Sequence, residues 1–141
     1  MSLKLSAKAQ EEVEFLEQVL KLCDHVSALV EQYSSAKTKS NADMYLSQIT
    51  RTLTQLRQKA MAKNLGFVAD AAGVLGVNAA RGSQVQRTRT IREGSVSLKA
   101  LVERTIKATG DTDRRERAQK EKDAAAAVAA TAKAKATEGG N

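Results

Sequence analysis

The sequence predicts an all-α protein, an up-down four-helix bundle with a C-terminal tail. The composition gives the first indication, because the chain has no proline, no tryptophan, two phenylalanines and two tyrosines, and is otherwise rich in residues that favour helices. Hydrophobic periodicity gives the second, since four segments carry apolar residues at spacings of three and four. The links between these segments are short, which places consecutive helices side by side. The length of 141 residues suits one domain.

The first helix is predicted from Ser6 to about Tyr33. Its apolar residues form a wide face, which is typical of a helix that packs against two neighbours in a bundle. This face combines two ladders of spacing three and four: Val13, Leu16, Leu20, Cys23 and Val30 on one, and Phe15, Val19, Leu22, Val26, Leu29 and Tyr33 on the other.

The second helix follows the polar connection SSAKTKSNAD, in which Ser40 or Asn41 is suited to cap the helix N-terminus. Its apolar residues form one narrow seam of the coiled-coil type: Leu46, Ile49, Leu53, Leu56 and Ala60. We expect the helix to end at residues 64–66, with Gly66 in the left-handed conformation that follows many helices.

The third helix is predicted from Phe67 to about Ala80. The residues expected to face inward are Val68, Ala71, Ala72, Leu75 and Ala79. Small residues recur at intervals of four, at positions 72, 76 and 80, and small residues let a neighbouring backbone approach closely.

The fourth helix is predicted to begin after a turn and cap at Gly82 and Ser83 and to end near Thr109 and Gly110. Its first half has few apolar residues and contains Gly94, so we expect its start to be loosely held. The inward positions are expected to be Val85, Ile91, Leu98, Leu101, Val102, Thr105 and Ile106.

The chain is therefore divided into a four-helix bundle at 1–110 and a charged, Ala-rich tail at 111–141. Asp113 followed by Glu116 resembles a capping box, and the composition of the tail favours helix. The tail nevertheless lacks a wide apolar stripe, so we expect it to be partly helical or disordered, with an extended helix laid on a partner as the alternative.

The charge of the chain is unevenly distributed, and this indicates where a partner binds. The net charge is +7, and residues 51–110 hold eleven Lys and Arg against three Asp and Glu. Acids of the first helix can neutralise some of these cations. The candidate partner-binding residues are Arg51, Lys59, Lys63, Arg81, Arg87, Arg89, Arg92 and Lys99.

Two functions from different classes fit this basic surface. The first is a protein-interaction module whose partner is an acidic protein or a second copy of the chain. The second is sequence-independent nucleic-acid binding through the Arg-rich region 81–92 and the basic tail. Phe67 is the one aromatic residue near this region, which disfavours stacking on single-stranded bases.

The inventory of reactive residues predicts no enzyme, no cofactor and no metal site. His25 is the single histidine and Cys23 the single cysteine, and these two do not supply the three or four ligands that zinc needs. The glycine-rich stretch GVLGVNAARGS is not followed by the Lys and Ser or Thr of a phosphate-binding loop. The chain shows neither a secretory signal nor an apolar run that spans a bilayer, so we expect a cytoplasmic protein without membrane contact.

The stretch LRQKAMAKNLGF, residues 56–67, resembles the core motif of histidine phosphotransfer domains, which are four-helix bundles that relay a phosphoryl group in two-component signalling. Lys59, Ala60, Ala62, Leu65 and Gly66 occupy motif positions, whereas Leu56 stands where the family carries its phosphorylated histidine. The resemblance therefore implies a degenerate domain, a signalling adaptor without phosphotransfer. The residues alone give a second interpretation, because the seam predicts that Leu56 is buried while Arg51, Gln55, Lys59 and Lys63 form an outward face.

Overall fold

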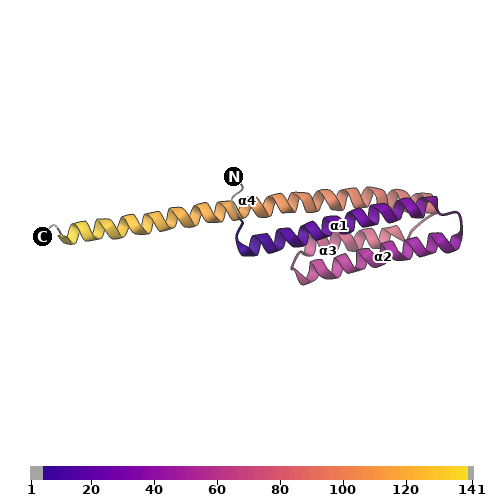
Figure 1. Ribbon diagram of the computed structural model, residues 1–141, viewed down its shortest axis with the longest axis horizontal. Coiled ribbons are helices and arrows are strands. Elements are labelled where there is room, and N and C mark those ends of the chain that lie inside the picture. The colour runs from indigo at the N-terminus through magenta and orange to yellow at the C-terminus, as the bar shows by residue number, and fades with distance from the viewer. Residues whose placement is uncertain (1–4, 140–141) are drawn as a thin grey trace.

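The computed structural model describes the backbone of residues 5–139 and the side chains of residues 5–129, and it confirms the all-α four-helix bundle. The described residues form helices α1 (Ala7–Ser35), α2 (Lys39–Ala62), α3 (Gly66–Ala79) and α4 (Gln84–Gly139). The helices run alternately up and down, with α1 between α2 and α4, and α3 closing the ring beside the same two helices (Figure 1).

The core consists of two clusters of buried side chains. One contains Leu16, Val19, Leu56, Val68 and Val102, and the other contains Val26, Leu53, Leu75 and Ile91 among others. Leu56 is 0% exposed, so the seam predicted for the second helix is confirmed. Each of the two clusters contains residues of all four helices, so both clusters hold the whole bundle together.

Both ends of α2 differ from the prediction. The N-cap is Thr38 rather than Ser40 or Asn41, because Thr38 has an extended backbone and its hydroxyl accepts the N–H of Asn41 at 3.1 Å. At the other end Asn64 takes the left-handed conformation, with φ 59°, in place of Gly66. Asparagine tolerates this region better than most residues, and Gly66 is thereby free to begin α3.

The start of α4 also departs from the pattern. Val85 was predicted to face inward but is 79% exposed, since the interior at this end is filled by Thr88, Ile91 and Ser95. Gly94 lies against α3 so closely that a Cβ atom there would overlap the side chain of Leu75. The glycine thus allows a close contact between two helices, and the turn before α4 is made by Gly82, with φ 86°.

The predicted end of the fourth helix near Thr109 and Gly110 is wrong, because α4 continues to Gly139 as a single helix of 56 residues. One glycine inside a helix costs only about 1 kcal/mol relative to alanine, and the segments beyond its Thr and Asp neighbours, up to Ala108 and from Arg114 onward, are rich in residues that favour helix. Asp113 and Glu116 accordingly lie inside α4 and do not cap it. At 1.5 Å per residue α4 is about 84 Å long, and its C-terminal part extends beyond the bundle (Figure 1).

Candidate interaction surface

Helix α4 holds both ends of α1. At one end the carboxylate of Asp113 accepts the backbone N–H of Ser6 at 3.0 Å, and Ser6 is the N-cap of α1. At the other end the Gln84 side-chain amide donates to the carbonyls of Tyr33 and Ala36 at 2.8 and 3.2 Å. The Ser6 N–H and the Ala36 carbonyl lie outside the hydrogen-bond ladder of α1, and the Tyr33 carbonyl, in the last turn, also accepts the N–H of Ala36 at 3.2 Å. The contacts from α4 therefore fix the register of the two helices.

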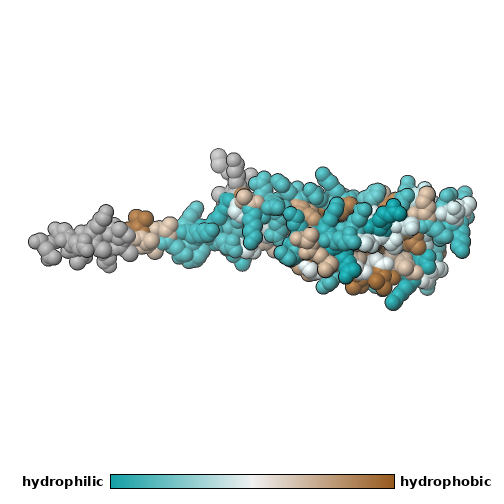
Figure 2. Space-filling model, turned by 90° about the horizontal axis from the view of Figure 1, so that it is seen from below, coloured by the Kyte–Doolittle hydropathy of each residue, from teal (hydrophilic) through white to brown (hydrophobic). Residues whose placement is uncertain are grey.

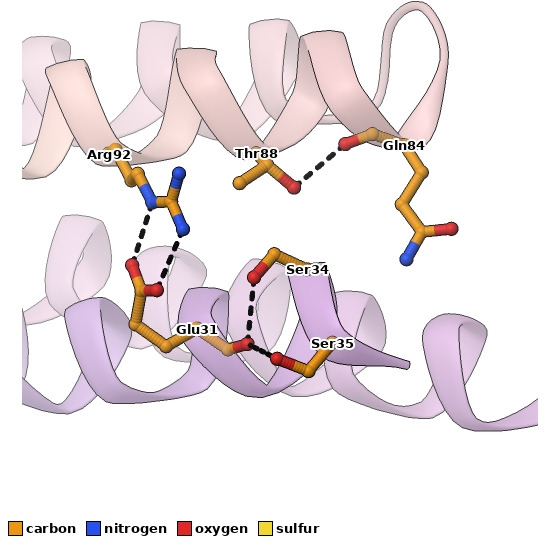
Figure 3. Close-up of polar contacts among 6 residues, drawn as sticks. All are labelled: Glu31, Ser34, Ser35, Gln84, Thr88 and Arg92. Carbon is orange, nitrogen blue, oxygen red and sulfur yellow. Dashed lines mark hydrogen bonds and ion pairs between the residues drawn. The ribbon is translucent and has the colours of Figure 1, made fainter. Parts of the chain in front are cut away.

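Three of the eight predicted partner-binding cations are ion-paired within the bundle. Arg92 donates twice to Glu31, at 2.7 Å each (Figure 3). Lys99 donates to Asp24 at 3.0 Å, and Lys63 to Glu11 at 3.1 Å. Acids of α1 therefore neutralise these three cations. The sequence analysis predicted that acids of the first helix neutralise some of the cations in residues 51–110.

The ion pairs shift the pKa values of their members in the expected directions. The hydrogen bond from Arg92 lowers the pKa of Glu31, and the same bond raises the pKa of Arg92. The hydrogen bond to Asp24 likewise raises the pKa of Lys99. All of these side chains are well exposed, so the pairs orient the helices more than they stabilise the fold.

The other five predicted cations form no ion pair with any residue of the described part of the chain. Arg51 and Lys59 lie on the outer face of α2, where they are exposed. Arg81 and Arg89 line the same surface hollow, of about 550 Å³, between the end of α3 and the start of α4. Arg87 is half-buried, and its Nε atom is buried without a hydrogen-bond partner.

The main surface feature that the sequence analysis missed lies on α3. This helix has 14 residues, of which Asp70 and Asn78 are the polar ones, and a helix that is apolar all round is normally covered on all sides. Here one side faces solvent, because Val74 is 60% and Val77 is 58% exposed. Apolar side chains are visible at the surface of the bundle on the side of α2 and α3 (Figure 2).

We call the residues along this exposed side, Asp70, Val74, Val77 and Arg81, the outer strip. They recur at spacings of four, three and four, which is the spacing of a seam between two packed helices. A hollow lies on each flank, one of about 510 Å³ toward α2 and one of about 600 Å³ toward α4. Leu75, Leu98 and Leu101 line the second hollow, so the strip and its flank form an apolar surface.

The exposed side of α3 has a signal in the sequence. Of the inward residues predicted for this helix, Val68, Ala72, Leu75 and Ala79 are buried and Ala71 is half-buried, and this set leaves Val74 and Val77 on the other side. Periodicity separates a buried face from a polar one, but α3 has only two polar residues to mark its outer face. The sequence analysis therefore placed the inward residues and did not recognise that the outer side is apolar and open to solvent.

The reactive residues lie apart from the outer strip. His25 is exposed on α1, and Cys23 is buried at 2% exposure. Burial raises the pKa of the Cys23 thiol to about 11, with a smaller contribution from Asp24. Within the described residues, no cluster of three or more His, Cys, Asp or Glu side chains is placed to hold a metal ion. None of the helices, over the part of the chain that the structure describes, is long and apolar enough to cross a membrane.

The stretch that resembles the phosphotransfer motif spans the end of α2 and the start of α3. Lys59 is exposed, Ala60 is buried, and Leu65 precedes α3 in the short link. Leu56, at the position of the family's histidine, points into the core. Leu56, Ala60 and Leu65 of this stretch support the bundle, whereas Lys59 and Met61 are exposed on α2 and Phe67 is exposed at the start of α3.

The chain has no match among protein-family models, curated proteins or solved structures. What its surface can bind therefore follows from its own residues and their geometry.

Proposed function

We propose that the protein is a non-enzymatic protein-interaction module whose docking surface is the outer strip of α3 and its flanking hollows. One observation carries this proposal: Val74 and Val77 are more than half exposed on a helix that is otherwise built like a core helix. Contiguous exposed apolar side chains with a polar border are typical of protein interfaces. Asp70 and Arg81 provide that border at the two ends of the strip.

We further propose that the module acts as a degenerate phosphotransfer-like signalling adaptor. Support comes from the motif-like residues at 59–66 and from the order of helices, an up-down bundle with the motif at the end of the second helix. The buried Leu56 side chain offers no group that accepts a phosphoryl group. Such an adaptor recruits a signalling partner by contact alone.

Nucleic-acid binding is the second candidate, and one observation favours it. The hollow that Arg81 and Arg89 share has no acidic residue in its lining, so both guanidinium groups are available to phosphates. Against it, Arg92 and Lys99 are already held by acids of α1, which removes two cations from the region predicted to contact a duplex.

Photo-crosslinking in the producing cell tests the interaction module. A photoreactive amino acid is placed at Val77, in the outer strip, and as a matched control at Val96, which is 69% exposed on α4 and lies outside the strip and its hollows. Both positions carry an exposed valine, so the two variants differ mainly in location. Irradiation is followed by electrophoresis and mass spectrometry of any adduct.

The expected result is a discrete covalent adduct from position 77 and none of that mass from position 96. Adding Arg81→Ala to the position-77 variant should weaken the adduct, because Arg81 borders the strip. Absence of an adduct at 77, or equal adducts from both positions, would contradict the assignment of the outer strip as a docking surface.

A further inference from the structure

The outer strip is self-complementary when it is read in reverse. Val74 and Val77 form its centre, Asp70 precedes Val74 by four residues, and Arg81 follows Val77 by four residues. An acidic residue and a basic residue thus lie at equal distances from an apolar centre. A surface of this kind matches a second copy of itself in one orientation.

From this symmetry we propose that a second copy of the chain docks on the outer strip, with the two α3 helices antiparallel about a twofold axis between Val74 and Val77. The proposal rests on the proposed function and names the partner of the same surface. In this arrangement Val74 of each copy faces Val77 of the other, and Asp70 of each copy faces Arg81 of the other. The contact is isologous, so it closes after two copies.

Charge selects the antiparallel orientation. If the two α3 helices were parallel, Asp70 would face Asp70 and Arg81 would face Arg81, and like charges across an interface are unfavourable. Neither residue forms an ion pair with another residue of the described chain, so both charges are available. Among these four side chains, the antiparallel orientation creates two ion pairs and no like-charge contact.

The ends of the strip support the same orientation. Phe67 is 48% exposed at the start of α3 and lines a hollow together with Thr105 and Thr109 of α4 and residues of the start of α1. Val85 is 79% exposed and lines the hollow that contains Arg81. In an antiparallel pair the α4 helices of both copies lie on the same side of the two α3 helices. The start of α3 in one copy is then next to the start of α4 in the other, which brings Phe67 of one copy to Val85 of the other. Two otherwise solvent-exposed apolar side chains are then covered.

The size of the outer strip determines how tightly the two copies are expected to bind each other. Helix α3 is about 21 Å long at 1.5 Å per residue, which places this interface at the small end of specific protein interfaces. We therefore expect a reversible dimer with a dissociation constant of about 1–100 μM.

Sedimentation velocity of the full chain over a concentration series tests the dimer through two charge reversals. Asp70→Arg places Arg opposite Arg at both ionic positions, and Arg81→Asp places Asp opposite Asp, so each variant alone should be monomeric at concentrations where the wild type dimerises. An equimolar mixture of the two variants restores opposite charges at both positions and should dimerise. Lys122→Asp, on the projecting part of α4, makes the same charge change as Arg81→Asp and should leave the dimer unchanged.

Circular dichroism checks that both variants keep the helical fold. A wild type that stays monomeric through the millimolar range, or a mixture of variants that stays monomeric while the wild type dimerises, would overturn the dimer. So would a dimer that persists in both single variants, because another surface would then be responsible. A monomeric wild type whose Val77 position still crosslinks to a different protein in the cell would overturn self-association and leave the interaction module in place.

Discussion

The carboxylate of Asp113 accepts the backbone N–H of Ser6 at 3.0 Å, across 107 positions of the chain. Ser6 caps α1 with its own side chain, which accepts the N–H of Ala9 at 3.2 Å, but its backbone N–H needs an acceptor from elsewhere. In a capping box this acceptor is the side chain of the third helical residue, which here is Ala9. Asp113 of α4 supplies it instead, so a helix cap and a tertiary contact are one interaction.

Asp113→Asn should lower the unfolding temperature at pH 7. The unfolding temperature of this variant should also fall less than that of the wild type when the pH is lowered. Hydrogen bonds from the hydroxyl and backbone N–H of Ser6 lower the pKa of Asp113, and the nearby Arg117 also lowers it. A carboxyl whose pKa is lower in the folded protein stabilises the fold above its unfolded pKa, about 3.9, and loses that contribution as the pH falls through the folded pKa. Thermal unfolding between pH 7 and pH 2 measures both effects.

The matched control is Asp123→Asn, on the exposed projecting part of α4, which should change the unfolding temperature little. The difference between Asp113→Asn and the wild type should shrink as the pH falls below 3. Equal unfolding temperatures of the two proteins at pH 7 would show that the contact between Ser6 and Asp113 does not stabilise the bundle.

Two glycines of α4 should respond in opposite ways to alanine. Gly94→Ala puts a methyl group into the space occupied by Leu75 and should destabilise the protein by about 1–2 kcal/mol, because overpacking outweighs the better helix propensity. Gly110→Ala meets little more than the end of the Arg114 side chain and should stabilise it by up to about 1 kcal/mol. Urea unfolding at equilibrium compares both variants with the wild type. A stabilising Gly94→Ala would mean that Leu75 moves aside freely.

The parts of this fold that the sequence predicted are those with local signals. Leu46, Ile49, Leu53 and Leu56 carry the helical spacing in their own segment, so the second helix and the burial of Leu56 followed from it. Ser6 was likewise recognised at the start of the first helix. The capping contact from Asp113 was not, since no local pattern links residues 107 positions apart.

Errors arose where a local signal was weak or was overridden. Gly110 was interpreted as a helix end, but α4 continues through it and its Thr and Asp neighbours into the segment from Arg114 onward, which is rich in helix-forming residues. Val85 was assigned to the core although it lies six positions before Ile91, the next apolar residue of α4, and it is 79% exposed. The buried side of α3 was predicted at Val68, Leu75 and Ala79 among others. The exposure of Val74 and Val77 on the opposite side was not, because it depends on whether another helix covers that side, which is a tertiary property.

Cys23 should be inert toward thiol reagents in the folded protein. The thiol is 2% exposed, and burial raises its pKa to about 11, so little thiolate forms at pH 8 and the reagent cannot reach it. Reaction with a chromogenic disulfide such as 5,5′-dithiobis(2-nitrobenzoic acid) should proceed only as fast as the protein opens, and should be rapid in concentrated urea. Fast reaction without denaturant would contradict the buried position of Cys23.

Duplex DNA should bind weakly, with loss of binding at physiological salt. Fluorescence anisotropy of a labelled duplex at several salt concentrations measures this, because binding driven by phosphate neutralisation weakens steeply as salt rises. Any binding at low salt should weaken when both Arg81 and Arg89 are replaced by Ala. It should change less in Arg92→Ala, because the Arg92 side chain of the wild type is already held by Glu31. Tight binding at physiological salt that depends on Arg81 and Arg89 would put nucleic-acid binding ahead of the interaction module.

Introducing a histidine at position 56 should not produce phosphotransfer. Leu56 is 0% exposed in the core, and removing such a side chain costs about 2–5 kcal/mol. Leu56→His adds a buried polar group without a partner to this loss, so we expect a strongly destabilised protein whose imidazole is inaccessible to a phosphodonor.

The control is Gln58→His, since Gln58 is exposed on α2 and a surface substitution there should change stability by less than about 0.5 kcal/mol. The readouts are urea unfolding and acid-labile phosphate after incubation with a phosphorylated receiver domain. If Leu56→His kept the wild-type stability and took up phosphate, position 56 would be accessible, and α2 would be turned relative to the core differently from the arrangement described.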